Sequence, residues 1–563
     1  MSGFEIAGVS LAVAGLLLTI NGAVDGFNLL ADICEKDNGL RFAFTQYHVE
    51  KAKLVVWAER FKVEDEINCL LLQQSQVTRD AVWRIIAEMN ATHELAIKFI
   101  TKYKVDPLAV PATVPAGSDV LQSQSKWAVM LRDARDRVPQ GSRVKWAARD
   151  REKFMGLISR LTVLNADLWD VVTPEETDAV RIVTGVLSGL TDQLSLAALQ
   201  ASPSTSSPAS LLAFAAQLKQ MQGETVSELA QRVKIITASE LQVWKAESND
   251  TSRRFRGTYT SGEVGGLPEP VWIEWKAVEK NNKAADAIML RIHALGALLA
   301  TANAAAFHRP VCLGVYEDAK YKERTSGDRR AGFVYRLDAP TDGSDLPLSL
   351  SDLVHAAQKT RTRAPLGDRF ELAYKLASAL SLFHATGWIH KSLRSDSILF
   401  SSSSSSSAPL GTQAGIVTAP QISGFQYSRP DADMSLESRP VGKPELDMYY
   451  HPEVASGWTK VKEIYSLGIV LLEIAYWRPV FEERFRQMSM ARVSQAILAD
   501  LEGKFGDDLA GMAGRTFVDV IKCCLAGRFG SLGGGACTPG EESKMLSDAF
   551  FHKVVRPLAS LRA

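Results

Sequence analysis

The chain has 563 residues, with 64 Lys and Arg against 64 Asp and Glu and a formal net charge of +0 at pH 7. This balance excludes an overall electrostatic attraction to nucleic acid, and no nucleic-acid partner is expected. The length exceeds one ordinary core and predicts two large modules, since domains usually span roughly 100–200 residues. The six cysteines include no C-x-x-C pair, which favours a reducing, cytoplasmic setting over a disulfide framework.

The chain opens with a stretch, residues 6–24, that carries no charged residue over 19 positions. This length is close to the roughly 20 apolar residues that span a bilayer as a helix. Glycine, alanine and asparagine dilute its hydrophobicity, so a helix packed inside a soluble bundle and a membrane span are both open interpretations. A conditional membrane segment, buried at rest, satisfies both. The large apolar residues expected to enter the membrane are Ile6, Leu11, Val13, Leu16, Leu17, Leu18 and Ile20.

Helical patterns dominate residues 1–200, and strand signals are rare there. Apolar residues recur at three- to four-residue spacing from Val82 to Met89 and from Phe154 to Leu164, as amphipathic helices require. Between Lys126 and Arg160, ten basic residues outnumber four acidic ones. This excess fits the solvated outer faces of a bundle, and attraction to anionic lipid is the alternative.

A Ser- and Pro-rich segment, residues 201–208, indicates a linker and a domain boundary. Apolar residues then recur at roughly helical spacing from Leu211 to Trp244 and predict a helical brace whose partner the sequence does not identify. We therefore interpret residues 1–200 as a helical bundle, 201–252 as linker and brace, and 253–563 as a second domain.

The pattern changes to mixed strands and helices beyond Ser252. Residues 271–276 alternate large apolar with other side chains and predict a strand, as do residues 332–337. Helices are expected over residues 284–305 and 368–385. The predicted architecture is α+β, with a small mixed lobe followed by a helical lobe.

The stretch from Trp388 to Phe400 resembles the catalytic loop of a protein kinase. That loop reads H-R-D-x-x-x-x-N, in which the Asp accepts the substrate hydroxyl proton and the Asn holds magnesium. His390 and the apolar triplet at residues 398–400 keep the frame, but Ser392 stands where the Asp belongs and Ser397 where the Asn belongs. The frame of a kinase is present, and two of its working groups are absent.

Other elements of this resemblance are preserved unevenly. Lys276 ends its strand where the V-A-I-K lysine would pair the nucleotide phosphates, whereas Gly424 replaces the metal-binding Asp of D-F-G. Residues 450–453 resemble the A-P-E element, and residues 463–474 resemble the buried helix that follows it. No G-x-G-x-x-G precedes Lys276, and the helix expected over residues 284–305 offers no Glu to pair with it.

The resemblance implies a bilobal protein kinase-like fold over residues 253–563. Loss of the base and of both metal ligands should reduce phosphoryl transfer by several orders of magnitude, since each such group contributes about 10²-fold or more. We therefore expect a pseudokinase without catalytic residues or a metal site. No cofactor is required, although ATP binding through Lys276 stays open. The tract from Ser401 to Ser407 is expected to be a disordered insertion and a candidate for phosphorylation.

The amino-terminal region supports a second resemblance. Residues 3–12, the triplet at 25–27, and above all residues 144–154 followed by Leu161 and Asn165 resemble the HeLo domain of fungal prion-inhibition and heterokaryon-incompatibility proteins. That family implies a helical bundle whose amino-terminal hydrophobic helix is released on activation and permeabilises membranes, causing cell death. The amyloid motif that follows some HeLo domains is not evident in this sequence.

Together the resemblances imply a multidomain protein, an all-α HeLo-like bundle followed by an α+β kinase-like fold. The expected function is a fungal cell-death or incompatibility effector, in which the pseudokinase restrains the bundle. Its expected partners are membrane lipid on activation, an upstream protein and further copies of the chain, with relocation from cytoplasm to membrane. One alternative is a divergent ATP-binding serine/threonine kinase that uses Lys276, His390 and Asp396, and another is a non-catalytic signalling scaffold.

Overall fold

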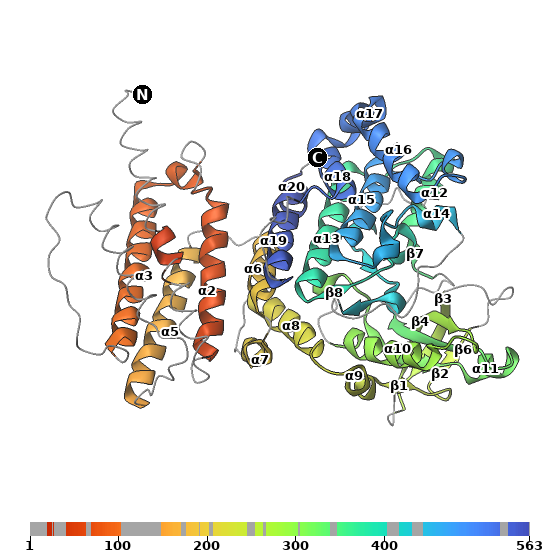
Figure 1. The fold of residues 1–563 in the computed structure, drawn as a ribbon, viewed down its shortest axis with the longest axis horizontal. Helices are drawn as coiled ribbons and strands as arrows, with labels where there is room; N and C mark the ends of the chain where they lie inside the picture. Colours follow the sequence, from red (N-terminus) through yellow and green to blue (C-terminus); the bar gives the residue numbers. More distant parts are fainter. Residues whose placement is uncertain are drawn as a thin grey trace. The chain divides into compact units, whose positions relative to one another are not determined.

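In the computed structural model, the chain divides into two compact units, residues 1–216 and 217–563. Figure 1 labels their helices and strands along the chain. The structure describes residues 20–24, 26, 41–63, 69–102, 148–170, 176–190, 192–201, 207–244, 254–262, 266–301, 305–337, 346–401, 416–430, 443–529 and 539–561.

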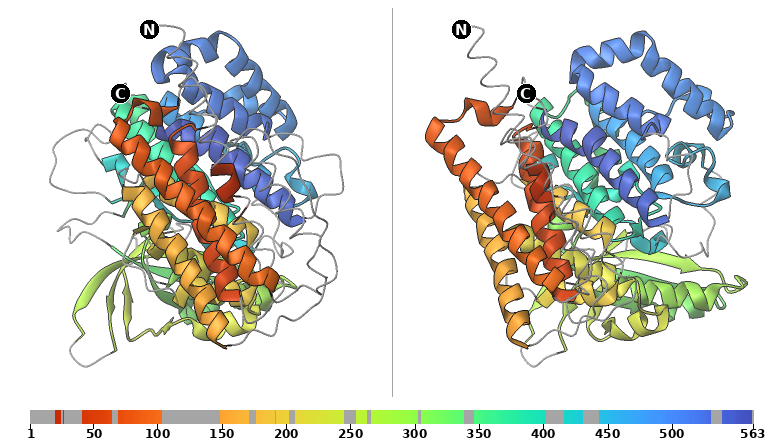
Figure 2. Two further views of the ribbon diagram at one scale, coloured as in Figure 1. Left: turned by 90° about the vertical axis from the view of Figure 1, so that its left-hand side faces the viewer. Right: turned by 60° about the vertical axis from the view of Figure 1, so that its left-hand side comes forward.

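The described part of the first unit is helical, which confirms the prediction of a helix-rich amino-terminal region. Its helices are α2 (Arg41–Arg60), α3 (Gln76–Lys102), α5 (Ala148–Asp170), α6 (Glu176–Gly189) and α7 (Gln193–Ala201), with a 3-10 turn at Leu70–Gln73. Helix α5 packs against both α2 and α3, and the three lie side by side in both views of Figure 2.

Each long helix of this bundle presents a stripe of buried residues at three- to four-residue spacing. In α3 the stripe comprises Val82, Ile86, Met89, His93 and Ala96, and in α5 it comprises Phe154, Ile158, Leu161, Asn165 and Leu168. Each stripe therefore contains one polar residue. Asn165 donates from Nδ2 to the carbonyl and to the carboxylate of Glu50, both at 2.8 Å, so the NH2 group of this buried amide is satisfied inside the bundle.

The second unit contains a six-stranded sheet in the order β1-β5-β6-β4-β3-β2. The strands are β1 (Ile235–Ile236), β2 (Leu241–Val243), β3 (Arg254–Thr260), β4 (Pro268–Val278), β5 (Cys312–Glu317) and β6 (Arg329–Arg336). Neighbouring strands are antiparallel except β1 and β5, which are parallel. The predicted mixed region is confirmed, and both predicted strands lie within or overlap β4 and β6.

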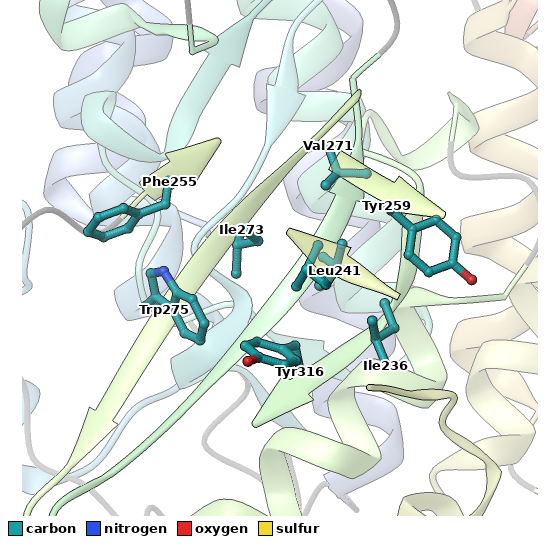
Figure 3. Close-up of a cluster of buried hydrophobic side chains, with 9 residues drawn as sticks. Ile236, Leu241, Phe255, Tyr259, Val271, Ile273, Trp275 and Tyr316 are labelled. Atoms are coloured by element: carbon teal, nitrogen blue, oxygen red, sulfur yellow. The ribbon is translucent and has the colours of Figure 1, made fainter. Parts of the chain in front are cut away.

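One face of this sheet carries a cluster of buried apolar and aromatic side chains (Figure 3). Its members are Ile236, Leu241, Phe255, Tyr259, Val271, Ile273, Trp275, Tyr316 and Val334. Alternation along β4 sends Ile273 and Trp275 to this face and Glu274 and Lys276 to the other, because successive side chains of a strand point to opposite sides. The face that bears Glu274 and Lys276 is the one on which the candidate site lies.

Helix α10 (Ala285–Leu299) packs against the sheet, mainly along β5, and α9 (Val226–Arg232) packs on α10. Helix α8 (Ser207–Met221) precedes α9 and crosses the boundary between the two units. Residues 207–243 thus form two helices and two strands, and those from residue 217 onward belong to the second unit.

The rest of the second unit is mainly helical. Its helices are α11 (Ala319–Arg324), α12 (Leu350–Thr360), α13 (Leu366–Ala385), α14 (Pro444–Asp447), α15 (Lys460–Tyr476), α16 (Met490–Glu502), α17 (Lys504–Ala513), α18 (Arg515–Ala526), α19 (Pro539–Phe550) and α20 (Arg556–Ala559). Helix α15 is buried along nearly its whole length and contacts α13, α17 and α18. Short strands border the loops of this helical region. They are β7 (Leu348–Ser349), β8 (Trp388–Ile389), β9 (Ile398–Phe400), β10 (Gln421–Ile422) and β11 (Arg429–Pro430).

Candidate functional site

The loop between β8 and β9 holds His390 in a fixed, neutral form. The Nε2 atom of His390 lies 2.9 Å from the carbonyl oxygen of Ser423, so Nε2 carries the proton, because a carbonyl only accepts. The Nδ1 atom accepts from the backbone N–H of Ser392 at 3.2 Å. Burial of the ring lowers the pKa of His390. This histidine therefore joins two loops and has no free nitrogen for proton transfer.

A buried carboxylate of α15 anchors the same loop. Glu463 accepts from the backbone N–H of Lys391 at 2.6 Å, and its other oxygen lies 2.9 Å from Nε2 of His384. Burial raises the pKa of Glu463, but the interaction with His384 and the bond from Lys391 outweigh that effect, so the pKa lies below its usual value. The bond also holds Lys391 in the left-handed region, at φ +66°.

The structure brings together the three positions that the kinase resemblance singles out. A Cβ atom built on Gly424 would lie 3.2 Å from Cβ of Ser397 and 3.6 Å from Oγ of Ser392. The hydroxyl of Ser397 donates to the carbonyl of Arg394 at 2.8 Å and accepts from its N–H at 3.0 Å, so it closes the loop locally. The buried hydroxyl of Ser392 has no hydrogen-bond partner among the described residues.

These three positions supply two hydroxyls and a glycine, and no carboxylate or amide. Within the described ranges no group of three or more His, Cys, Asp or Glu side chains could hold a metal ion. Gly424 has φ +89°, a conformation that an Asp at this position would adopt only with strain. Asp396, the base considered for a divergent kinase, is held by Arg394 through two bonds of 2.9 and 3.1 Å.

Lys276 lies on β4 with its side chain directed at an aromatic ring. Its ammonium nitrogen is 3.9 Å from the centroid of the Tyr427 ring, close enough for a cation–π interaction. Tyr427 follows Gly424 by three residues in a short 3-10 turn (Phe425–Tyr427). The lysine therefore contacts the segment in which the metal-binding motif would stand.

An ion pair between a buried carboxylate and a partly exposed guanidinium lies beside Lys276. Glu274 accepts from the guanidinium of Arg254 at 3.2 Å and from the backbone N–H of Gly424 at 2.8 Å. Arg254 also donates to the carbonyl of Asp396 at 2.7 Å and to the hydroxyl of Ser423 at 3.0 Å. This Arg254–Glu274 network ties the sheet to the loop that contains Asp396 and to the segment at Ser423 and Gly424. Sequence reasoning missed it, although Glu274 stands two residues from Lys276 and thus on the same face of the strand.

A small cavity borders this region. It has a volume of about 30 Å³ and is lined mainly by apolar residues of α10, α13 and β8, together with His390 and Phe425. Such a volume holds about one water molecule. Leu218 from α8 completes its wall.

The first unit holds the described end of the amino-terminal stretch. Residues 20–24 and 26 are helical, and Ile20, Gly22, Ala23 and Gly26 are buried. A Cβ atom on Gly26 would lie 2.7 Å from Cγ of His93, so the helix backbone and the imidazole are in close contact. The other residues predicted to enter a membrane, Ile6, Leu11, Val13, Leu16, Leu17 and Leu18, lie outside the described residues. Among the helices that the structure describes, none has the length and apolarity to cross a bilayer.

Comparison with known families assigns the amino-terminal region to a described family. Residues 8–199 match the HeLo family, described as prion-inhibition and propagation, and residues 323–562 match a domain of unknown function, DUF7580. No curated protein matches the chain. Residues 8–199 are therefore a HeLo domain, which confirms that part of the sequence interpretation. A HeLo domain indicates a function of the fungal cell-death or incompatibility type.

Proposed function

We propose that the protein is a fungal cell-death or incompatibility effector whose HeLo bundle acts on membrane lipid when released. The second unit is a kinase-like domain without phosphoryl-transfer activity, and it restrains the bundle until a signal arrives. The protein resides in the cytoplasm before activation and moves to the membrane afterwards.

The observation that carries this proposal is the close packing against His93 of Gly26, which lies two residues beyond the uncharged stretch. Ile20 and Ala23 are also buried, so the described end of the uncharged stretch is stored inside the bundle. The lack of a side chain at Gly26 allows the imidazole of His93 to lie against the helix backbone. A stored apolar segment is what a conditional membrane element requires. Release of this segment from the bundle loses the favourable free energy of burying these side chains. A bilayer offers an apolar environment that can replace it.

Several features of the second unit support a kinase-like domain that does not catalyse. A mixed sheet with a packed helix precedes a helical region, and Glu463 of α15 fixes the loop at Lys391. Ser392, Ser397 and Gly424 offer no base and no magnesium ligand at the positions where phosphoryl transfer needs them. Arg254 pairs with Glu274, and the ring of Tyr427 lies against the ammonium of Lys276, so both charged groups of this strand are engaged within the protein.

The segment that follows the HeLo domain offers a route for restraint. Gln222 donates from Nε2 to the carbonyl of Thr386, and its side chain fits against Gly387, whose φ is +77°. Helix α9 packs on α10, and β1 pairs with β5. A rearrangement of α10 or β8 would therefore change the contacts of the chain at the end of α8. Helix α8 begins in the first unit.

The test compares leakage of vesicles of phosphatidylcholine and phosphatidylserine caused by the full chain and its Gly26→Ala variant. The added methyl group displaces the stored helix, so Gly26→Ala should leak several-fold faster than the unchanged protein. Gly156→Ala is the matched control, because a Cβ at Gly156 meets no atom within 4 Å. Removing residues 1–19 from the Gly26→Ala variant should abolish leakage, and equal leakage with and without them would overturn the membrane role of this stretch.

A further inference from the structure

A second, larger pocket lies in the helical part of the second unit. Its volume is about 330 Å³, within the roughly 300–1,000 Å³ of known ligand pockets. It is formed by α12, the end of α15, the loop at residues 478–485, α16 and α17. It shares no lining residue with the cavity beside His390.

Aromatic residues form much of the wall of this pocket. Tyr476 and Phe505 meet edge to face with ring centroids 5.3 Å apart, and Phe481 and Phe485 do so at 6.3 Å. Leu472 and Ile497 add aliphatic surface. Rings held in this way give a rigid apolar surface that can receive a large side chain with little loss of conformational entropy.

The acidic residues around the pocket are paired with an arginine, whereas a second arginine, Arg478, has no acidic partner among the described residues. Arg484 pairs with Glu482 at 2.8 Å and also with Asp500, so both acidic groups that line the pocket are occupied by one arginine. Arg478 contacts the Tyr476 ring, with its guanidinium carbon 5.6 Å from the centroid. Among the described residues it makes no hydrogen bond and no ion pair. The pocket thus combines an apolar wall with one uncompensated guanidinium, the group best suited to bind a carboxylate through two hydrogen bonds.

The geometry points to a docking site for a segment of a partner protein in which a large apolar side chain stands next to a carboxylate. The apolar residue packs between Tyr476 and Phe481, and Arg478 binds the carboxylate. This inference goes beyond the proposed function, because it names the chemistry of the partner and does not depend on membrane activity.

Saturation-transfer NMR with the full chain tests it, using N-acetyl-phenylalanine as the probe and its neutral amide as the comparison. The acid should bind about tenfold more tightly than the amide, as a charge-assisted hydrogen-bonded pair implies. Arg478→Gln should remove this preference, whereas Arg492→Gln, an exposed arginine of α16 outside the pocket, should keep it. Acetyl-Asp-Phe-amide distinguishes a side-chain carboxylate from a chain terminus, because only the former places the charge beside an amidated phenylalanine.

Arg478→Glu provides a second variant, in which the preference should reverse in favour of phenethylammonium. Arg478 is only half-buried, so both variants should melt within a few degrees of the unchanged protein. Equal binding of acid and amide, or an acid preference that survives in Arg478→Gln, would overturn the inference. Either result leaves the vesicle-leakage test of the proposed function unaffected.

Discussion

Lys276 places its ammonium group 3.9 Å from the centre of the Tyr427 ring, and the two residues thereby join the sheet to the turn after Gly424. A partly buried cation–π pair contributes about 0.5–2 kcal/mol. Tyr427→Leu should lower the free energy of unfolding of the second unit by that amount, and Tyr427→Phe should lower it much less, because the ring is retained. Urea denaturation followed by circular dichroism measures both. An equal decrease in the free energy of unfolding in the two variants would show that the aromatic ring does not stabilise the protein through Lys276.

The Arg254–Glu274 network should be a major source of stability between the sheet and the loops. Glu274→Ala removes the buried carboxylate that accepts from the partly exposed guanidinium of Arg254, and loss of such a charge-assisted bond costs about 1.5–3 kcal/mol. Glu269→Ala is the control on the same strand, since its ion pair with Arg336 is exposed and should contribute less than about 1 kcal/mol. The double change Arg254→Met with Glu274→Met should recover part of the loss. A Glu274→Ala variant as stable as Glu269→Ala would contradict the role given to this network.

His93 should make the stability of the HeLo bundle depend on pH. Complete burial lowers the pKa of His93 from 6.5 to about 3. Below pH 6.5 the unfolded chain therefore binds a proton at His93 that the folded bundle does not bind. The free energy of unfolding decreases as the pH falls from 6.5 towards 3. The slope approaches about 1.4 kcal/mol per pH unit.

Hydrogen exchange of the α3 amides between pH 7 and pH 5 measures this loss after correction for the intrinsic exchange rate. His93→Gln should flatten the pH dependence, although it changes the packing against Gly26 at every pH. His48→Gln serves as the control, because the side chain of His48 is only half-buried. An unchanged slope in His93→Gln would assign the pH dependence to other groups.

Nucleotide binding can be tested through stability as well. A ligand that binds only the folded state at 100 times its Kd stabilises by about 2.7 kcal/mol, which raises the melting temperature by several degrees. We expect 1 mM ATP with magnesium to leave the melting temperature of the full chain and of Lys276→Met equally unchanged. A saturable rise that Lys276→Met abolishes would restore ATP as a ligand of the second unit.

The helical periodicity of the first unit could be predicted because each helix is long and carries a regular apolar stripe. Val82, Ile86 and Met89 follow that rule and are fully buried. His93 continues the same stripe one turn further, and its contact with Gly26 brings together segments nearly 70 residues apart. Periodicity indicates which face of a helix is buried, but it does not identify the neighbour.

In the second unit, the resemblance to a protein kinase predicted that Ser392, Ser397 and Gly424 belong together, because the kinase motifs place these three positions in one site. The short strands β1 and β2 could not be predicted, since two or three residues carry no recognisable alternation. Arg254 and Glu274 were missed for another reason. A charged residue in a strand usually faces solvent, and only their pairing across β3 and β4, with Gly424 as a third partner, makes their burial favourable.

The anchor at Glu463 binds a backbone N–H of Lys391, a group that every residue except proline supplies. This anchor holds the loop at residue 391 without any contribution from the side chain at position 392, while the hydroxyl of Ser397 closes the loop further along. A change of side chain at position 392 therefore leaves this anchor in place, and the loop keeps its shape at residue 391 whatever chemical group that position carries.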